Sequence, residues 1–194
     1  MLTLTEHTTE TLVEKQSKFI AHLLPYNMYA EVLKSLKVEH PKARHFVTAF
    51  RYINAFDQVV EGSSDDGEPR GTSGKPTLAV LQGNELINVA VITVRYFGGT
   101  KLGTGGLVRA YSDATNLVIA TSSLITYEKE SDLFVSCLYS DIGKVGYLLE
   151  TLGVSVKEKT FDATGENMRL VATQEKLETF LQEAKRLVSV ITPS

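Results

Sequence analysis

The order of hydrophobic and polar positions along the chain predicts strands and helices in alternation. Short runs of β-forming residues between polar residues indicate strands, and apolar residues that recur every three or four positions indicate helices. We predict strands at residues 11–14, 18–24, 45–52 and 88–96, and helices at residues 29–36, 76–82 and 107–118. The strand at 88–96 is almost entirely apolar, which is typical of a central strand buried on both faces.

The last third of the chain has a pattern of its own. We predict a strand at 133–139, a helix that begins after Asp141 and ends at Gly153, a hairpin at 154–161 and 168–172, and a helix after Thr173, with a further strand at 188–192. This β-α-β-β-α order is that of a ferredoxin-like layer. We therefore predict an α+β protein of two domains, residues 1–130 and 131–194, joined by the polar segment 128–131.

Two glycine-rich segments interrupt the first domain. Residues 54–74 show no apolar periodicity and are predicted to be one long loop, and residues 97–106 form a second, shorter loop before the helix at 107–118. Long irregular segments inside a compact domain are usually functional or disordered. Both segments are therefore candidates for a functional site.

Composition narrows the class of protein. The chain has 194 residues, of which 43% are hydrophobic and 22% charged, and this excludes wholesale disorder. No apolar run approaches the roughly 20 residues that cross a bilayer, and no secretory signal is visible. Cys137 is the single cysteine, which excludes an intrachain disulfide and a multi-cysteine zinc site. We expect a cytoplasmic protein with no membrane and no disulfide partner, whose net charge of −3 leaves local basic patches open.

The second glycine-rich segment is the stronger candidate for a binding site. No acidic residue occurs between Glu85 and Asp113, whereas three cations lie in that interval and can converge on the loop. Glycine lets the backbone approach a phosphate closely, and the N-terminus of the following helix favours an anion. The candidate RNA- or anion-binding residues are Arg95, Tyr96, Gly98, Gly99, Lys101, Gly103, Gly105, Gly106 and Arg109.

A structural role is the alternative for these residues. The glycines would then serve tight turns and helix–sheet contacts, and Arg95 and Arg109 would be internal braces paired with loop acids such as Asp65 or Asp66. At least one of the two aromatic residues at 96 and 97 would belong to the core instead of stacking on nucleobases.

Neither common nucleotide-binding motif is present. Lys75 is followed by Pro76 where a phosphate-binding loop has Ser or Thr, and the segment from Gly103 to Val108 lacks the last glycine of a dinucleotide fingerprint. The loop therefore indicates an anion site of no recognised nucleotide class.

The first segment carries three carboxylates, on Asp65, Asp66 and Glu68. Such a group can hold a hard cation or take part in acid–base chemistry, but the spacing is not that of an EF-hand. The acids can equally form turns or pair with Arg70 and Lys75. We predict a structural role for them and assign no metal, no cofactor and no catalytic residue.

Other reactive side chains are expected to be structural. Cys137 lies in an apolar strand, where a free cysteine is usually a small core residue. His45 precedes an apolar strand and is expected to be hydrogen-bonded instead of acting as a base. His7, His22 and His40 show no metal-ligand spacing.

At the two glycine-rich segments the sequence resembles the signature of the YigZ/Impact family. The motifs are Ser64-Asp-Asp-Gly-Glu-Pro-Arg-Gly-Thr-Ser-Gly-Lys-Pro76 and Val94-Arg-Tyr-Phe-Gly-Gly-Thr-Lys-Leu-Gly-Thr-Gly-Gly-Leu-Val-Arg-Ala-Tyr111. Residues 15–20 and 42–45 fit the same pattern, and residues 130–194 resemble the small C-terminal domain of the bacterial branch. Ser73 departs from the motif, which often has alanine there.

The resemblance implies both a fold and a context. The N-terminal domain would be similar to the second domain of ribosomal protein S five and to domain IV of elongation factor G, and the C-terminal domain to domain V of that factor. In eukaryotes, Impact proteins restrain a stress kinase by competing for its ribosome-bound activator, a role that relies partly on an extra N-terminal domain. No catalytic residue set comes with the family.

These observations predict a cytoplasmic, translation-associated binding protein that contacts RNA, the ribosome or a protein partner. The alternative is a metal-assisted enzyme that acts on a phosphate-containing or nucleotide substrate, with the three carboxylates facing the second loop. Contact between the two loops is required for that enzyme.

Overall fold

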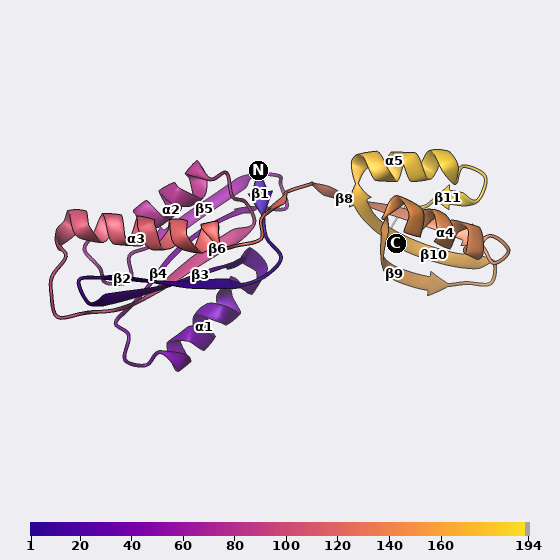
Figure 1. Ribbon diagram of the computed structural model, residues 1–194. Helices are drawn as coiled ribbons and strands as arrows, with labels where there is room; N and C mark the ends of the chain where they lie inside the picture. The colour runs from indigo at the N-terminus through magenta and orange to yellow at the C-terminus, as the bar shows by residue number, and fades with distance from the viewer. Residues whose placement is uncertain (193–194) are drawn as a thin grey trace. The chain divides into compact units, whose positions relative to one another are not determined.

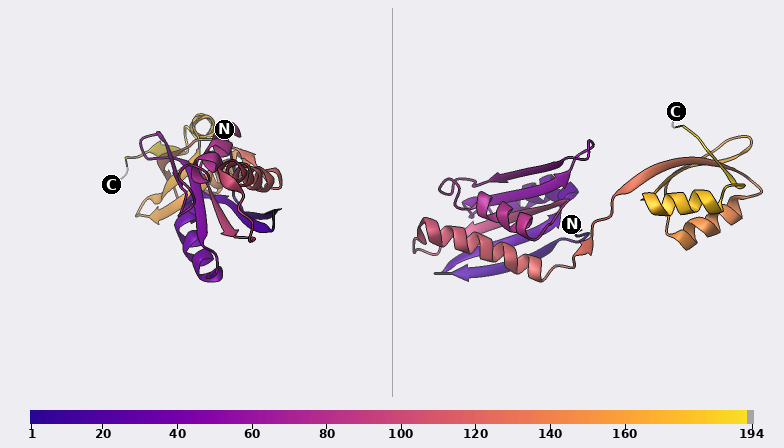
Figure 2. Two further views of the ribbon diagram at one scale, coloured as in Figure 1. Left: turned by 90° about the vertical axis from the view of Figure 1, so that its left-hand side faces the viewer. Right: turned by 90° about the horizontal axis from the view of Figure 1, so that it is seen from above.

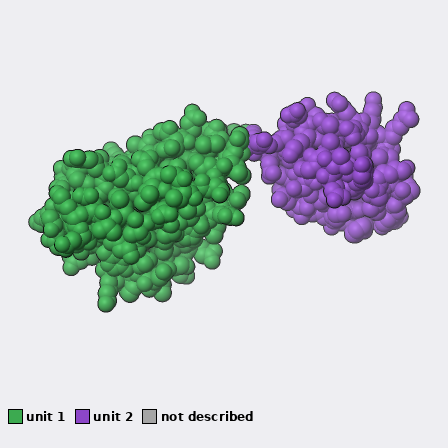
Figure 3. All heavy atoms as spheres, in the orientation of Figure 1, with its two compact units in different colours: residues 1–127 green, residues 128–194 purple. Residues whose placement is uncertain are grey.

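The computed structural model describes residues 1–192, which belong to two compact units. Unit 1 runs from Met1 to Tyr127 and unit 2 begins at Glu128 (Figure 3). The buried residues of each unit form clusters of their own, two in unit 1 and one in unit 2. Each unit is therefore described by itself.

Unit 1 is built on a five-stranded antiparallel sheet with the order β2-β3-β6-β4-β5. The strands are β2 (Thr8–Glu14), β3 (Ser17–Pro25), β4 (His45–Ile53), β5 (Val59–Ser64) and β6 (Val89–Tyr96). A separate pair of two-residue strands, β1 (Leu2–Thr3) and β7 (Ile125–Thr126), joins the two ends of the unit. The most apolar strand, β6, lies at the centre of the sheet, as its composition predicts.

Helices cover both faces of this sheet. The short helix η1 (Tyr26–Met28) and α1 (Tyr29–Glu39) lie on one face, and α2 (Gly74–Gly83) and α3 (Gly103–Ala120) lie on the other (Figures 1 and 2). Successive side chains of a strand point to opposite faces, so each strand contributes to two cores. Phe19 and Val91 pack under α2 and α3, whereas Ile20 and Ile92 pack under α1.

Unit 2 has the element order β-α-β-β-α-β and the strand order β11-β8-β10-β9, which together define a ferredoxin-like layer. Its elements are β8 (Glu130–Leu138), α4 (Ile142–Leu152), β9 (Ser155–Phe161), β10 (Gly165–Thr173), α5 (Gln174–Glu183) and β11 (Val188–Val190). Gly153 ends α4 in the left-handed conformation, with φ of 63°. Thr173 caps α5 through a 3.4 Å hydrogen bond that its Oγ1 accepts from the backbone N–H of Lys176. The predicted core position of Cys137 agrees with its burial in this unit.

The sequence did not predict the short strands β1 and β7 or the first residues of β10, and three further differences concern β5, α3 and α4. Residues 59–64, predicted as loop, form the edge strand β5, whose exposed and glycine-containing sequence hides the strand pattern. The helix predicted from Leu107 begins earlier, at Gly103, so part of the second glycine-rich segment is helical. Asp141 precedes α4 as predicted, but its side chain makes no capping hydrogen bond. The α+β class is confirmed, and the likeness of unit 1 to the ribosomal and elongation-factor domains stays a prediction.

Candidate functional site

Both glycine-rich segments lie at the same end of the sheet of unit 1. The first loop, residues 65–73, connects β5 to α2, and the second loop, residues 97–102, connects β6 to α3. Because all five strands are antiparallel, the end of β6 lies beside the start of β4 and the start of β3. The β2–β3 turn and the α1–β4 connection therefore meet the two loops at this end.

A buried ion pair joins the first loop to the end of β6, where the second loop begins. Arg95 Nη1 lies 2.5 Å from Glu68 Oε1, and the two side chains are 7% and 3% exposed. Tyr111 on α3 donates a 2.7 Å hydrogen bond to the same carboxylate oxygen. Burial, together with the adjacent carboxylate of Glu68, raises the pKa of Tyr111 far above its ordinary value, so the phenol remains a donor. The guanidinium carbon also lies 5.3 Å from the ring centroid of Phe19.

Asp65 organises the first loop and the start of α2. Its carboxylate accepts hydrogen bonds from the backbone N–H groups of Gly71, Ser73 and Gly74, at 2.7, 3.2 and 2.8 Å, and from the Ser73 hydroxyl at 2.7 Å. Burial by itself would raise the pKa of Asp65, but these hydrogen bonds together lower it. The carboxylate thus satisfies N–H groups that the first turn of a helix leaves without partners.

Asp66 ties the first loop to the beginning of β4. Its Oδ2 accepts a 2.6 Å hydrogen bond from the backbone N–H of Phe46, and its backbone carbonyl lies 2.9 Å from His45 Nδ1. His45 is thus hydrogen-bonded, as expected from the sequence. The first loop contacts Arg95 and Tyr111, which lie before and after the second loop in the chain. The enzyme alternative requires carboxylates that face the second loop, whereas all three carboxylates point to internal partners and not to a shared open pocket. Among residues 1–192, no three His, Cys, Asp or Glu side chains gather in a way that could hold a metal ion.

The structure separates Arg95 from the other two candidate cations. Arg95 is 6% exposed, whereas Lys101 and Arg109 are exposed. The alternation of β6 places Arg95 on the face covered by α2 and α3, so its guanidinium is enclosed. Arg95 therefore does not face solvent together with Lys101 and Arg109, and its burial matches the alternative interpretation of an internal brace. Its partner is Glu68 instead of Asp65.

The glycines of the second glycine-rich segment, residues 97–106, differ in their surroundings. A Cβ on Gly98 would lie 2.0 Å from the backbone carbon of Gln16, so only glycine lets this loop pack against the β2–β3 turn. The backbone N–H of Gly98 donates a 3.1 Å hydrogen bond to Ser17 Oγ, which fixes the approach. Gly106 packs against Leu102, while the remaining glycines of the candidate set face open space: Gly99, Gly103 and Gly105.

The two aromatic residues that follow Arg95 differ in their exposure to solvent. Tyr96 is half-buried, and its hydroxyl lies 2.9 Å from Nδ1 of His40 at the end of α1. Phe97 is 56% exposed. Tyr96 thus belongs to the packing under α1, and Phe97 is presented to solvent.

Exposed cations gather around the two loops. Nine lysines and arginines lie on the connections and element ends at this end of the sheet, and among residues 1–192 none of them has a carboxylate within ion-pair distance. We call this surface the cationic end: Lys15, Lys18, Lys37, Lys42, Arg44, Arg70, Lys75, Lys101 and Arg109. Its exposed acids are fewer: Glu14, Glu39 and Asp113.

The opposite end of the same sheet has the reverse character. Its connecting segments, residues 1–7, 26–28, 54–58, 84–88 and 121–127, contain no lysine or arginine and carry Glu6, Asp57 and Glu85. Unit 1 is therefore electrically polarised along its strands. Sequence reasoning missed most of the cationic end because its members are scattered from residue 15 to residue 109 and meet only through strand pairing.

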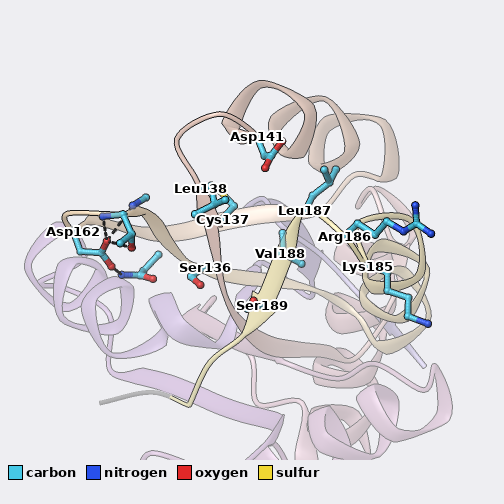
Figure 4. Close-up of a pocket in the computed structure, with 13 residues that line it drawn as sticks. Ser136, Cys137, Leu138, Asp141, Asp162, Lys185, Arg186, Leu187, Val188 and Ser189 are labelled. Carbon is cyan, nitrogen blue, oxygen red and sulfur yellow. Dashed lines mark hydrogen bonds between the residues drawn. The ribbon is translucent and has the colours of Figure 1, made fainter.

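Unit 2 contains a cavity of about 240 Å³ between the β8–α4 connection, the β9–β10 turn and the start of β11. The side chains of Lys185 and Arg186 point away from Asp162 (Figure 4). The Asp162 carboxylate is already occupied by hydrogen bonds from the Thr164 hydroxyl and N–H, from Gly165 and from Asn167, which lower its pKa. This cavity offers no convergent set of free polar groups.

No helix within residues 1–192 combines the length and the apolar character needed to span a membrane.

The family model described as the Impact N-terminal domain matches residues 15–119, which include both loops. An IMPACT family member from Haemophilus influenzae is 37% identical over 181 residues, covering 87% of this chain and 83% of the relative. The IMPACT family member YigZ of Escherichia coli is 39% identical over 146 residues, covering 72% and 71%.

A solved structure supports the fold along the whole chain. The crystal structure of a hypothetical protein matches with a TM-score of 0.73 at 28% identity, and the match covers 100% of this chain and 97% of the other. The two relatives cover 87% and 72% of this chain, and the family model covers the segment that builds the loops. The chain therefore belongs to the IMPACT family, as the motifs at residues 64–76 and 94–111 indicate.

Proposed function

We propose that unit 1 binds RNA through the cationic end and that the protein acts as a translation-associated binding protein. The observation that carries this proposal is the gathering of unpaired lysines and arginines at one end of the sheet, opposite an end that has none. Among the acids of the first motif, Arg95 neutralises Glu68, and Asp65 and Asp66, whose carboxylates accept hydrogen bonds from backbone N–H groups, are outnumbered by the nine exposed cations.

The physics of phosphate binding fits this surface. Each lysine or arginine that neutralises a phosphate releases counterions, so a cluster of free cations attracts a polyanion although the whole chain has a net charge of −3. The β2–β3 turn and the second loop are held against each other by Gly98, so Lys15 and Lys101 lie on connected, ordered segments. Ordering before binding reduces the entropy cost of association.

Membership of the IMPACT family supports the translation context of the proposal. The family resemblance implies contact with the ribosome or with regulators that bind it, and ribosomal RNA is the most abundant polyanion in that setting. A protein partner with an acidic surface would contact the same cations. The experiment below distinguishes the two kinds of partner, because only the RNA proposal requires binding to oligouridine.

The test is the salt dependence of RNA binding by the full chain. Titration of a labelled oligouridine at several salt concentrations should give a linear log–log plot, and the double variant Lys101→Ala/Arg109→Ala should flatten its slope by about 1.4, or about 0.7 per lost phosphate contact. Lys144→Ala is the matched control, because this lysine of α4 is 71% exposed and lies in unit 2. Absence of oligouridine binding by the parent protein, or equal slopes for all variants, would overturn the proposal.

A further inference from the structure

Phe97 stands at the middle of the cationic end. It follows β6, the central strand of the sheet, and its side chain is 56% exposed. Cations from neighbouring connections surround this position in sequence and topology: Lys15 and Lys18 from the β2–β3 hairpin, and Lys101 from its own loop. A large apolar ring placed among free cations is not explained by packing alone.

Phe97 has an anchored residue before it and another after it in the chain. The guanidinium carbon of Arg95 lies 5.8 Å from the ring centroid of Phe97, and Arg95 is itself fixed by the buried pair with Glu68. On the other side, Gly98 is packed on the Gln16–Ser17 backbone and hydrogen-bonded to Ser17. The backbone that carries the exposed ring is therefore anchored on both sides, which reduces the part of the chain that must be ordered on binding.

We propose that Phe97 stacks on an unpaired nucleobase, so that the cationic end selects single-stranded over double-stranded RNA. This inference rests on the proposed function, because the cations supply the contacts to the phosphates. Aromatic side chains stack on bases of any sequence, whereas the bases of a duplex are already stacked and their faces are closed to a protein. The ring thus adds a contact that only single strands can make.

The chain contains a matched control for an exposed phenylalanine. Phe56 is 82% exposed in the β4–β5 turn, at the opposite end of the sheet, where Asp57 and no lysine or arginine accompanies it. A single exposed phenylalanine is common on protein surfaces, and Phe56 represents that ordinary case. Phe97 differs from it in its anchored neighbours and in the surrounding positive charge.

The experiment compares a labelled oligouridine with an RNA duplex of equal length, using the full chain and its variants. Phe97→Ala should weaken oligouridine binding about tenfold, within the range for loss of one base stack, and leave duplex binding unchanged. The salt slope should stay that of the parent, since no phosphate contact is lost. Phe97→Trp should retain the affinity, Phe97→Leu should lose it, and Phe56→Ala should behave as the parent. Equal melting temperatures of Phe97→Ala and the parent show that the fold is intact.

The outcomes distinguish this inference from the proposed function. Equal affinity of the parent for single strands and duplex, or an unchanged affinity of Phe97→Ala for oligouridine, would overturn the stacking role while leaving salt-dependent binding standing. Failure of the parent to bind either RNA would overturn both. An affinity of Phe97→Leu for oligouridine equal to that of the parent would also overturn the stacking role, because an aliphatic side chain would then replace the ring.

Discussion

Glu68 in the first glycine-rich loop and Arg95 at the end of the central strand form a buried ion pair. Arg95 is the next-to-last residue of β6, and its Nη1 lies 2.5 Å from Oε1 of Glu68. The hydroxyl of Tyr111 completes the coordination of the carboxylate from α3. This pair holds the first loop against the end of β6, and Phe97 and the second loop follow directly from that end.

Removing one partner of this pair should strongly destabilise unit 1. Glu68→Ala leaves the Arg95 guanidinium buried without a counter-charge, and its Nε already lacks a hydrogen-bond partner. We expect a loss of about 3–5 kcal/mol in the free energy of unfolding, measured by urea denaturation.

A double-mutant cycle provides the control for that experiment. Glu68→Leu/Arg95→Met removes both charges and keeps apolar volume, so its loss of unfolding free energy should be smaller than the summed losses of the single variants Glu68→Leu and Arg95→Met. Additive losses would show that the two side chains do not interact energetically. Oligouridine binding by the folded double variant would further show that the pair acts on stability more than on the contact with RNA.

Asp65 should be required for the order of the first loop and not for metal binding. Asp65→Ala removes the acceptor for the N–H groups of Gly71, Ser73 and Gly74, and we expect a loss of about 1–3 kcal/mol in the free energy of unfolding. Calorimetry of the parent with magnesium, calcium, manganese or zinc should show no tight site. A stoichiometric manganese or magnesium site that disappears in Asp66→Ala would contradict this and favour the enzyme alternative.

His22 should make the stability of unit 1 fall in mild acid. Its ring is buried between strands, Nδ1 lies 2.9 Å from Thr9 Oγ1 and 3.1 Å from His7 Nε2, and Nε2 has no partner. Burial, and then the charges of His7 and His40, lower the pKa of His22 from 6.5 to about 4. The unfolded chain therefore takes up this proton first as the pH falls below 6.5, and the fold loses stability until the pH reaches about 4.

The size of this effect is measurable as a difference between two proteins. We expect the pH change to cost the parent about 3 kcal/mol more than His22→Gln, which lacks the titrating ring. Chemical denaturation of both proteins at a series of pH values gives the difference, and the carboxylates that also titrate in this range cancel. Parallel stability curves for parent and variant would show that His22 keeps an ordinary pKa.

The two units should fold independently. Their hydrophobic clusters share no residue, and the polar segment 128–131 lies at the division between them. Limited proteolysis should first cleave near residues 127–132, and the fragment 132–194 should melt cooperatively. First cuts inside residues 107–118, together with a fragment that shows no cooperative transition, would mean that the chain folds as one unit.

Local patterns in the sequence determine much of this protein. Apolar periodicity predicts most helices and strands, the β-α-β-β-α order predicts the ferredoxin-like layer, and two contiguous motifs indicate the family. These features are readable because helix and strand preferences and motif spacing depend on neighbouring residues. The sequence did not predict the edge strand β5, because its side chains are largely exposed. It also did not predict the first turn of α3, because glycine is a poor helix former.

Only the tertiary structure decided what the charged residues of the motifs do. A strand buried on both faces leaves open which side its last residues face, so the sequence could not say whether Arg95 is an internal brace or a surface cation. The cationic end likewise depends on the antiparallel order β2-β3-β6-β4-β5, which brings Lys15 and Arg109 to one end of one sheet. These charges are far apart in the sequence and meet only because strand pairing places the connecting loops side by side. Strand pairing depends on long-range contacts, since the sheet forms by burying both of its faces.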